Sequence, residues 1–580
     1  MDENKPQALP NLDYKIVVGD SLIPKFDGEI LEIDWDKKTT ISPKFNVFIA
    51  NGKQLLAQIV TKQKAYFDPK TKYKPKAAAE IRNLKIYLLI NQLAYNKLYY
   101  LDNNTKLIDS GLGLTAKEKQ KNLAIDLHIA FLDNQTKKLN QLLANHDLPF
   151  DHFDWKLDFP EILNDQVADF MGFDIVIGNP PYIDSESMLK SGNEKLREYL
   201  SKKMKFCKGN WDIYIAFFDY GFTLLSQNGN LVFITPDKWI SKPFGYELRK
   251  GLKNNFIKIA EAGRKVFETA KVDSIITFIS ANNKDKIKID KFENYKPFNY
   301  SEVYKNTFEE PFAYDWLFSD NVALLSKFNL LQNKFSDYAI CENACATSDA
   351  YKLQDYVLEL GNNDFNSEKH LKVINKGTIG KYTSKWGDRQ MTYLGNKYLK
   401  PIVNKQKFLL DFANSYGTKS IVPKIIIKSL TLLDGCLDID GCVIPGKSTL
   451  VIKTKNKVKD LYFPLSILNS KFAIFFIKQK YRGSSYNQGI NFNYDMINNL
   501  PLPKMNLPAQ TPFINLVDKI LKAKKSGNAT QHWENEIDIM VYKLYDLSYA
   551  EAKIIDNDLS ESDFDKYNLA DNATGESNFL

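Results

Sequence analysis

The sequence lacks long apolar runs and a secretion signal. No stretch of its 580 residues approaches the roughly 18 uncharged apolar residues that a membrane-spanning helix needs. The first residues, Met1-Asp2-Glu3-Asn4-Lys5, are polar and acidic, which fits neither a signal peptide nor a transit peptide. We therefore expect a cytoplasmic protein with no membrane partner.

Cysteine and histidine are both scarce, with five residues of each. The cysteines are Cys207, Cys341, Cys345, Cys436 and Cys442. No two of them have the CxxC spacing typical of structural zinc sites, and only His370 lies near them in the sequence. Buried reduced thiols are the favoured interpretation, with zinc as the open alternative, and we predict no metal.

The charge is unevenly distributed along the chain. The formal net charge is +8, although the stretch after Tyr549 is acidic, so the remainder is more basic than the total implies. A basic surface suits a polyanionic partner such as DNA. The hydrophobic fraction of 44% and the charged fraction of 26% are those of an ordinary globular protein.

Four short apolar runs rich in β-branched residues predict buried strands. They cover residues 14–18, 173–177, 231–234 and 274–279. A segment of helical pattern, 213–225, lies between the second and the third. Such strands alternating with helices predict a parallel sheet covered on both faces, in which chemistry lies beyond the carboxyl ends of the strands.

The tetrapeptide Asn179-Pro180-Pro181-Tyr182 follows the second predicted strand and fits chemistry on an adenine amino group. That group is a poor nucleophile, and two hydrogen-bond acceptors draw its nitrogen toward tetrahedral geometry. The Asn179 side chain and the Pro180 backbone carbonyl can provide them, because proline stiffens the backbone. Tyr182 offers a flat face for a base that has left the helix. A stiff turn without function is the alternative.

This stretch resembles the NPPY-type N6-adenine DNA methyltransferases, especially the C-terminal part of type IIG restriction–modification enzymes. The resemblance implies S-adenosylmethionine as cofactor and double-stranded DNA as substrate. It implies that Asp20, with Ser21 and Leu22, contacts the cofactor's adenine ring, and that Phe267 stacks with Tyr182 on the flipped base. Asp20 as a loop cap and Phe267 as a core aromatic are the plainer alternatives. Other stretches that match the family are 153–161, 210–218 and 229–236.

Residues 336–504 resemble a target-recognition domain. Two stretches within it, 385–400 and 478–482, interleave basic and aromatic residues. The candidate DNA-binding residues are Lys385, Trp386, Arg389 and Arg482. A solvated face with anchored aromatics is the alternative for both stretches.

The family's glycine-containing first motif and its N-terminal nuclease have no counterpart that we can identify. Asp109-Ser110-Gly111-Leu112-Gly113 is a weak candidate, and we interpret it as a loop before a helix that Thr115 caps. We therefore predict that a separate polypeptide supplies the first strands and most of the cofactor pocket, and that it could also carry the nuclease. The rival interpretation is a non-catalytic DNA-specificity subunit that keeps the fold without a complete cofactor site.

The predicted fold class is α/β. A partial Rossmann-like methyltransferase sheet, lacking its N-terminal strands and carrying a helical insertion, precedes a mixed α+β recognition domain and C-terminal helices. The predicted segments are 1–73 (partial methyltransferase domain), 74–150 (helical insertion), 151–320 (catalytic domain), 321–510 (recognition domain), 511–555 (C-terminal helices) and 556–580 (acidic flexible tail).

Overall fold

The chain divides into two compact units. The first comprises residues 1–236, 255–257 and 274–284, and the second comprises 237–254, 258–273 and 285–580. The computed structural model describes residues 15–36, 43–68, 74–105, 115–168, 171–263, 273–293, 296–308, 313–454, 457–481, 485–486 and 489–566. The predicted domain boundaries stay predictions, although the division between the units falls inside the predicted catalytic domain.

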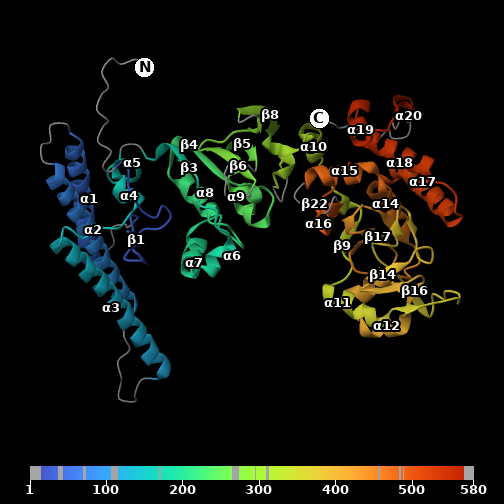
Figure 1. Cartoon of the computed structure of the whole chain (residues 1–580), viewed down its shortest axis with the longest axis horizontal. Coiled ribbons are helices and arrows are strands. Elements are labelled where there is room, and N and C mark those ends of the chain that lie inside the picture. Colours follow the sequence, from blue (N-terminus) through green and yellow to red (C-terminus); the bar gives the residue numbers. More distant parts are fainter. Residues whose placement is uncertain are drawn as a thin grey trace. The chain divides into compact units, whose positions relative to one another are not determined.

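The first unit contains three long helices, α1 (Pro43–Phe67), α2 (Lys74–Asn103) and α3 (Ala116–Ala144), seen as a bundle in Figure 1. Their apolar residues form one core with Phe26, Leu31 and Leu157. Helices α2 and α3 lie within the predicted helical insertion at 74–150, and Thr115 and Glu118 form the capping box that starts α3. Helix α1 was not predicted. Residues 109–113 lie outside the described residues.

A short hairpin precedes the bundle, with β1 (Lys25–Phe26) and β2 (Glu29–Ile30) joined by Asp27-Gly28, both at positive φ. The strand predicted over 14–18 is wrong where the structure describes it, at residues 15–18. Ile16 and Val18 are 70% and 90% exposed. Ile16 forms only an isolated β-bridge, and none of the described strands pairs along this stretch, so no ladder extends the bridge into a strand.

The other three predicted strands are confirmed as β3 (Phe173–Gly178), β4 (Leu225–Pro236) and β6 (Ser274–Ser280), which neighbour one another in that order. Strand β3 runs parallel to β4, with Gly178 opposite Phe233. Strand β6 runs antiparallel to β4, with Ser274 opposite Pro236. The prediction of a wholly parallel sheet is therefore wrong, because a near-continuous apolar run does not reveal the direction of a strand.

One face of this sheet is covered. Helix α8 (Tyr214–Thr223) is the predicted crossover helix, and it lies so close to β4 that a Cβ on Gly221 would be 2.8 Å from Leu231. Helices α4 (Trp155–Asp158) and α5 (Pro160–Leu163) contribute to the core on β3, and α6 (Ser185–Lys190) and α7 (Glu194–Lys203) follow β3 in the chain. On the other face, Ile175 and Ile177 are 68% and 77% exposed. The prediction that both faces are covered is wrong for β3.

The second unit includes most of β5 (Phe256–Gly263), together with β7 (Lys286–Glu293), parallel to it, and β8 (Lys296–Tyr304), antiparallel to β7. A four-stranded antiparallel sheet follows, in the order β19 (Gly435–Asp438), β17 (Lys424–Lys428), β21 (Thr449–Lys453) and β9 (Ile340–Asn343). A second four-stranded sheet has the order β10 (Leu358–Glu359), β16 (Pro401–Asn404), β11 (His370–Ile374) and β20 (Val443–Pro445).

Shorter elements complete this unit. The helices are α9 (Tyr246–Gly251), α10 (Val322–Asn329), α11 (Thr347–Lys352), α12 (Lys405–Asp411), α13 (Ser415–Ser420) and α16 (Tyr494–Asn498). The strands are β12 (Ile379–Gly380), β13 (Thr383–Ser384), β14 (Met391–Tyr393), β15 (Asn396–Tyr398), β18 (Leu430–Thr431), β22 (Ser485–Tyr486) and β23 (Gly489–Asn491).

The unit ends in helices α14 (Tyr462–Asn469), α15 (Lys471–Lys480), α17 (Leu507–Lys525), α18 (Gln531–Leu544), α19 (Tyr549–Ile555) and α20 (Glu561–Asp565). The flexible tail predicted from 556 is wrong for residues 556–566. Asp556 pairs with Lys471 at 2.7 Å, and Phe564 is buried beneath the Lys543 ammonium. Residues 567–580 lie outside the described residues.

No single helix in the described ranges is long and apolar enough to cross a membrane. The bent pair 458–469 and 471–480 meets those criteria. Its apolar side chains, including Phe463, Leu465 and Phe472, are buried in the core of the second unit.

Candidate active site

The backbone that leads into the tetrapeptide after β3 is tightly packed, whereas the first side chain of the tetrapeptide, Asn179, is exposed. A Cβ on Gly178 would lie 3.0 Å from the Phe233 ring, so the end of β3 packs tightly on β4. Asn179 is exposed, whereas Pro180 is buried. The Asn179 amide is therefore accessible on a backbone that its neighbours fix.

Tyr182 closes the tetrapeptide against the ends of two other strands. Burial raises the pKa of Tyr182, and the nearby Ser274 side chain, at the first residue of β6, acts in the opposite direction. Ser274 stands opposite Pro236, the last residue of β4. The structure thus brings together the carboxyl ends of β3 and β4, where chemistry was predicted.

The stretch 210–218 anchors the exit of this loop. The Ile213 N–H donates to the Ile183 carbonyl at 3.0 Å. Trp211 is fully buried and donates to Ser201 Oγ at 3.1 Å, while Arg197 donates to the Trp211 carbonyl at 3.0 Å. This stretch is a scaffold for the loop after β3.

The predicted cofactor residues lie in a compact loop. Asp20 Oδ1 accepts from the Leu22 and Ile23 amides at 3.1 and 3.4 Å, and Oδ2 pairs with Lys25 at 2.8 Å. The Ser21 carbonyl accepts from Trp155 Nε1 at 3.0 Å, and Leu22 is buried. Asp20 is thus a loop cap, and its carboxylate remains about one-third exposed.

An apolar cluster links this loop to the catalytic strand. Val17, Phe153, Trp155, Phe159 and Val176 all belong to it. Gly19 packs directly against Phe153. A Cβ at position 19 would lie 2.1 Å from the Phe153 Cβ, so no other residue fits there without a shift. The predicted lead-in, 153–161, therefore packs the Asp20 loop and β3 onto the same core.

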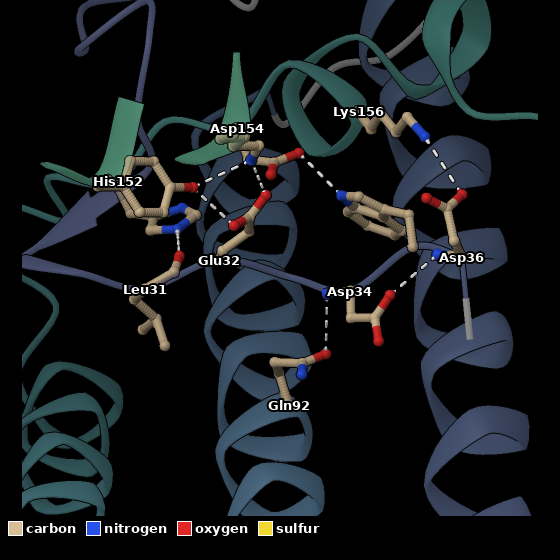
Figure 2. Close-up of polar contacts among 11 residues, drawn as sticks. Leu31, Glu32, Asp34, Asp36, Gln92, His152, Asp154 and Lys156 are labelled. Carbon is tan, nitrogen blue, oxygen red and sulfur yellow. Dashed lines mark hydrogen bonds and ion pairs between the residues drawn. The ribbon is translucent and has the colours of Figure 1, made fainter. Parts of the chain in front are cut away.

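A polar network that sequence reasoning missed surrounds Asp154, and Figure 2 shows its side chains converging from several segments. Asp154 caps α4 and accepts from Trp35 Nε1 at 3.1 Å. Burial raises its pKa to about 6, although these hydrogen bonds act in the opposite direction. Asp158 accepts from the Asp154 amide at 2.9 Å and pairs with the buried Lys85 of α2 at 2.6 Å.

The network extends to both sides. Buried His152 hydrogen-bonds the Leu31 carbonyl at 3.1 Å, and burial lowers its pKa. Tyr199 of α7 donates to Glu32 at 2.7 Å. The network thus ties the helical bundle to the lead-in and to α7. The one hint in the sequence is that an Asp-Trp dipeptide occurs at 34–35 and again at 154–155. Because Trp35 and Asp154 are more than a hundred residues apart, no local pattern predicts their hydrogen bond.

The candidate DNA-binding residues divide into two kinds. Lys385 and Arg389 are exposed. Trp386 is an anchored aromatic, since its indole donates to the Pro401 carbonyl at 2.8 Å and Lys372 lies over its ring. In the second stretch, Lys480 is buried and donates to Asn329 at 2.6 Å, so a DNA contact from Lys480 is excluded in this conformation.

Two predicted residues, Phe267 and Arg482, lie outside the described residues. The five cysteines are free, and burial raises the pKa of Cys345 to about 11 and that of Cys436 to about 12. Within the described ranges, no group of three or more His, Cys, Asp or Glu residues is arranged to hold a metal ion.

Known proteins are similar to parts of this chain. Residues 28–267 match the family described as Eco57I restriction-modification methylase. The type II restriction enzyme and methyltransferase RM.Eco57I of Escherichia coli is 28% identical over 127 residues, which are 21% of this chain and 13% of that protein. The type II methyltransferase M.TthHB8I of Thermus thermophilus is 34% identical over 93 residues, 14% of this chain and 22% of that protein.

A solved structure of the type IIL restriction-modification enzyme MmeI in complex with DNA matches with a TM-score of 0.36 and 10% identity, covering 88% of this chain and 78% of that one. The alignments with RM.Eco57I and M.TthHB8I each span less than a quarter of that relative's length. The family match includes Asn179 to Tyr182 and begins after Asp20. Residues 28–267 of this chain are therefore similar to the Eco57I restriction-modification methylase family.

Proposed function

We propose that the chain transfers a methyl group from S-adenosylmethionine to N6 of an adenine flipped out of a specific duplex DNA site, within a restriction–modification system. The observation that carries the proposal is the Asn179-Pro180-Pro181-Tyr182 loop at the carboxyl end of β3. It lies inside the matched family region, and its first side chain is accessible on a fixed backbone.

The proposed chemistry needs no covalent intermediate. Asn179 and the Pro180 carbonyl accept hydrogen bonds from the adenine amino group, so the positive charge that develops during attack meets two oriented dipoles. Tyr182 stacks on the base, and its hydroxyl lies near Ser274 of β6. Phe267 is proposed as the second stacking residue.

The Asp20 loop fits part of the cofactor. S-adenosylmethionine supplies an electrophilic methyl group. An ionised carboxylate has about four acceptor positions, and Leu22, Ile23 and Lys25 occupy three of those on Asp20. One position is therefore left for the amino group of the cofactor's adenine ring, with Ser21 and Leu22 completing the loop. We propose that a separate polypeptide holds the remainder of the cofactor.

The second unit is proposed to choose the DNA sequence. Lys385 and Arg389 are exposed cations beside an anchored aromatic, an arrangement suited to phosphate contact. Arg482 stays a prediction in the same role, and so does the cytoplasmic location.

Transfer of a labelled methyl group from S-adenosylmethionine to mixed-sequence duplex DNA tests the proposal. The 580-residue chain is assayed alone and together with the product of the adjacent upstream reading frame, with Asn179→Ala as the control. We expect incorporation that the control lacks. Equal incorporation by both proteins would contradict the assigned role of Asn179.

A non-catalytic DNA-specificity subunit is the second candidate. The observation that favours it is the Asp20 carboxylate, which its own loop and Lys25 already largely occupy. This candidate predicts specific DNA binding with no incorporation under any condition above.

A further inference from the structure

A pocket lies between the β1–β2 hairpin and helices α2 and α3, inside the first unit, and we call it the bundle pocket. Its volume is about 370 Å³, a size typical of sites that hold small molecules. Its lining comes from residues 29–32, from 93–100 of α2 and from 128–135 of α3. None of the described lining residues belongs to the loop after β3 or to the Asp20 loop. The bundle pocket is therefore separate from the proposed methyl-transfer site.

Aromatic rings form much of the wall of the bundle pocket. Tyr99 and Tyr100 of α2 and His128 and Phe131 of α3 all line it. The Tyr100 and His128 ring centroids are 4.0 Å apart, so these two rings pack on each other. Tyr99 and Phe131 are 54% and 37% exposed. Two large aromatic side chains are thus partly exposed beside a cavity, an arrangement suited to a flat ligand that stacks on them.

Gln135 is the one buried polar residue among the lining residues that the structure describes. It is 3% exposed, and its side-chain oxygen Oε1 has no hydrogen-bond partner among the described residues. A buried acceptor without a donor is costly, because it has lost its hydrogen bonds to water. A ligand N–H at Gln135 would restore one of them.

Asn96 gives the lining a group of the opposite polarity. Its Oδ1 accepts from Gln92 Nε2 at 2.6 Å, so its Nδ2 is the group left to donate to a ligand. Gln135 and Asn96 thus offer one acceptor and one donor. A ligand that satisfies both carries an N–H group and an acceptor atom.

The charge of the bundle pocket is acidic. Its acidic residues are Glu29 and Glu32, and no lysine or arginine is among the described lining residues. Lys203 and Tyr199 of α7 pair with Glu32. The exposed Glu29 is therefore the carboxylate that a ligand can reach. A carboxylate repels phosphate and accepts hydrogen bonds from sugar hydroxyls, so the charge favours a nucleoside over a nucleotide.

We propose that the bundle pocket binds a purine nucleoside whose base carries an amino group, of the adenosine class. The base stacks on the aromatic wall, its amino group donates to Gln135 Oε1, and a ring nitrogen accepts from Asn96 Nδ2. Side-chain amides recognise adenine through this pair of groups in nucleic acids. Glu29 accepts from the sugar. The proposal concerns a second ligand site and does not depend on methyl transfer.

Two other occupants fit the bundle pocket less well. A polyamine would suit the aromatic rings and Glu29, but it has no acceptor for Asn96 Nδ2. A base flipped out of DNA would bring its flanking phosphates to an acidic rim. A free nucleoside meets the rings, both amides and the carboxylate.

Titration calorimetry of adenosine into the 580-residue chain tests the proposal, and amide hydrogen exchange locates the site. We expect binding with slower exchange at 128–135. Purine riboside, the same nucleoside without the amino group, should bind about tenfold more weakly, because it leaves Gln135 Oε1 without a donor. In Gln135→Leu the two nucleosides should bind alike. The matched control Gln63→Leu removes another buried amide oxygen that lacks a partner among the described residues, outside the pocket, and should bind like the original chain.

Three results would overturn the inference: no binding of adenosine, equal binding of adenosine and purine riboside to the original chain, or binding that Asp20→Ala abolishes and Gln135→Leu leaves intact. The third result would place adenosine at the candidate cofactor loop. Binding of spermidine in place of adenosine would indicate an organic-cation site and would overturn it too. Exchange and the comparison of nucleosides are read on the original chain, so neither depends on the folding of a variant. Methyl transfer is no part of the readout, so this proposal and the proposed function can fail separately.

Discussion

Strands β3 and β17 have similar apolar sequences and opposite environments. In β17, Ile425, Ile426 and Ile427 are all fully buried, and strands β19 and β21 pair with its two edges. In β3, Ile175 and Ile177 are largely exposed, and one edge has no partner among the described strands. Burial in this chain is thus set by neighbouring elements, and an apolar strand that lacks them indicates a surface for binding or chemistry.

The charged pairs beside the two strands differ in the same way. Lys424, in β17, pairs with Asp438 at 2.5 Å and donates to the carbonyls of Ser420 and Val422, with both side chains buried. Asp20 and Lys25, in the candidate cofactor loop, are each more than one-third exposed. The first pair is built for stability, and the second can exchange partners.

The largest expected effect is on the buried pair. Lys424→Ala should lower the free energy of unfolding of the second unit by about 3–5 kcal/mol, because it leaves the Asp438 carboxylate buried without its cation. Lys25→Ala should cost about 1 kcal/mol or less in the first unit, since its pair is partly solvated. Denaturant titration followed by hydrogen exchange in each unit measures both. Equal losses would contradict the comparison.

The next largest effect is expected on the rate of methyl transfer, with no change in the stability of the fold. Asn179→Ala should lower methyl transfer about 10²–10³-fold, the loss typical of removing one oriented dipole from a reacting centre. Because the Asn179 side chain is exposed, the thermal unfolding midpoint of the Asn179→Ala variant should match that of the original chain. Single-turnover methylation and a melting curve on the same samples provide the readout. A large drop in the midpoint would mean that Asn179 is structural.

A matched pair of small truncations sharpens the comparison of the strands. Ile426→Val should cost about 0.5–1.5 kcal/mol, because it leaves a small cavity in a packed core. Ile177→Val in the isolated chain should change stability by less than about 0.5 kcal/mol, because its side chain is exposed. If Ile177→Val were as costly as Ile426→Val, the face of β3 would be buried in solution.

A further expected effect is a dependence of stability on pH in both units. Burial raises the pKa of Asp154 in the first unit and of Asp538 in the second to about 6, from an ordinary value near 3.8. The folded state therefore holds these protons more tightly, and the stability they confer is complete below pH 4 and lost as pH rises through about 6. Asp154→Asn should flatten this slope in the first unit only, and Asp538→Asn in the second only.

Local patterns in the sequence predicted most of the elements that frame the site. The run 173–177, the helical pattern 213–225 and the capping signal at Thr115 each rest on neighbours in sequence, and each was confirmed. The direction of β6 and the open face of β3 were mispredicted, because both depend on which strands lie alongside. The Asp154 network could not be predicted, since its partners come from residues 31–36, 85 and 199.

The site itself was predictable only in part. The tetrapeptide at 179–182 has a distinctive sequence, and its location at a strand's carboxyl end is confirmed. The proximity of Tyr182 to Ser274 relates residues 92 positions apart, and no local pattern in the sequence predicts it. The roles of Asp20 and Phe267 stay predictions.

The most direct measurement of the central claim is mass spectrometry of nucleosides from duplex DNA incubated with S-adenosylmethionine, the chain and the upstream gene product. We predict N6-methyl-2′-deoxyadenosine in that reaction and none when Asn179→Ala replaces the original chain. Methylation of cytosine, or of adenine at the same level with Asn179→Ala, would contradict the account.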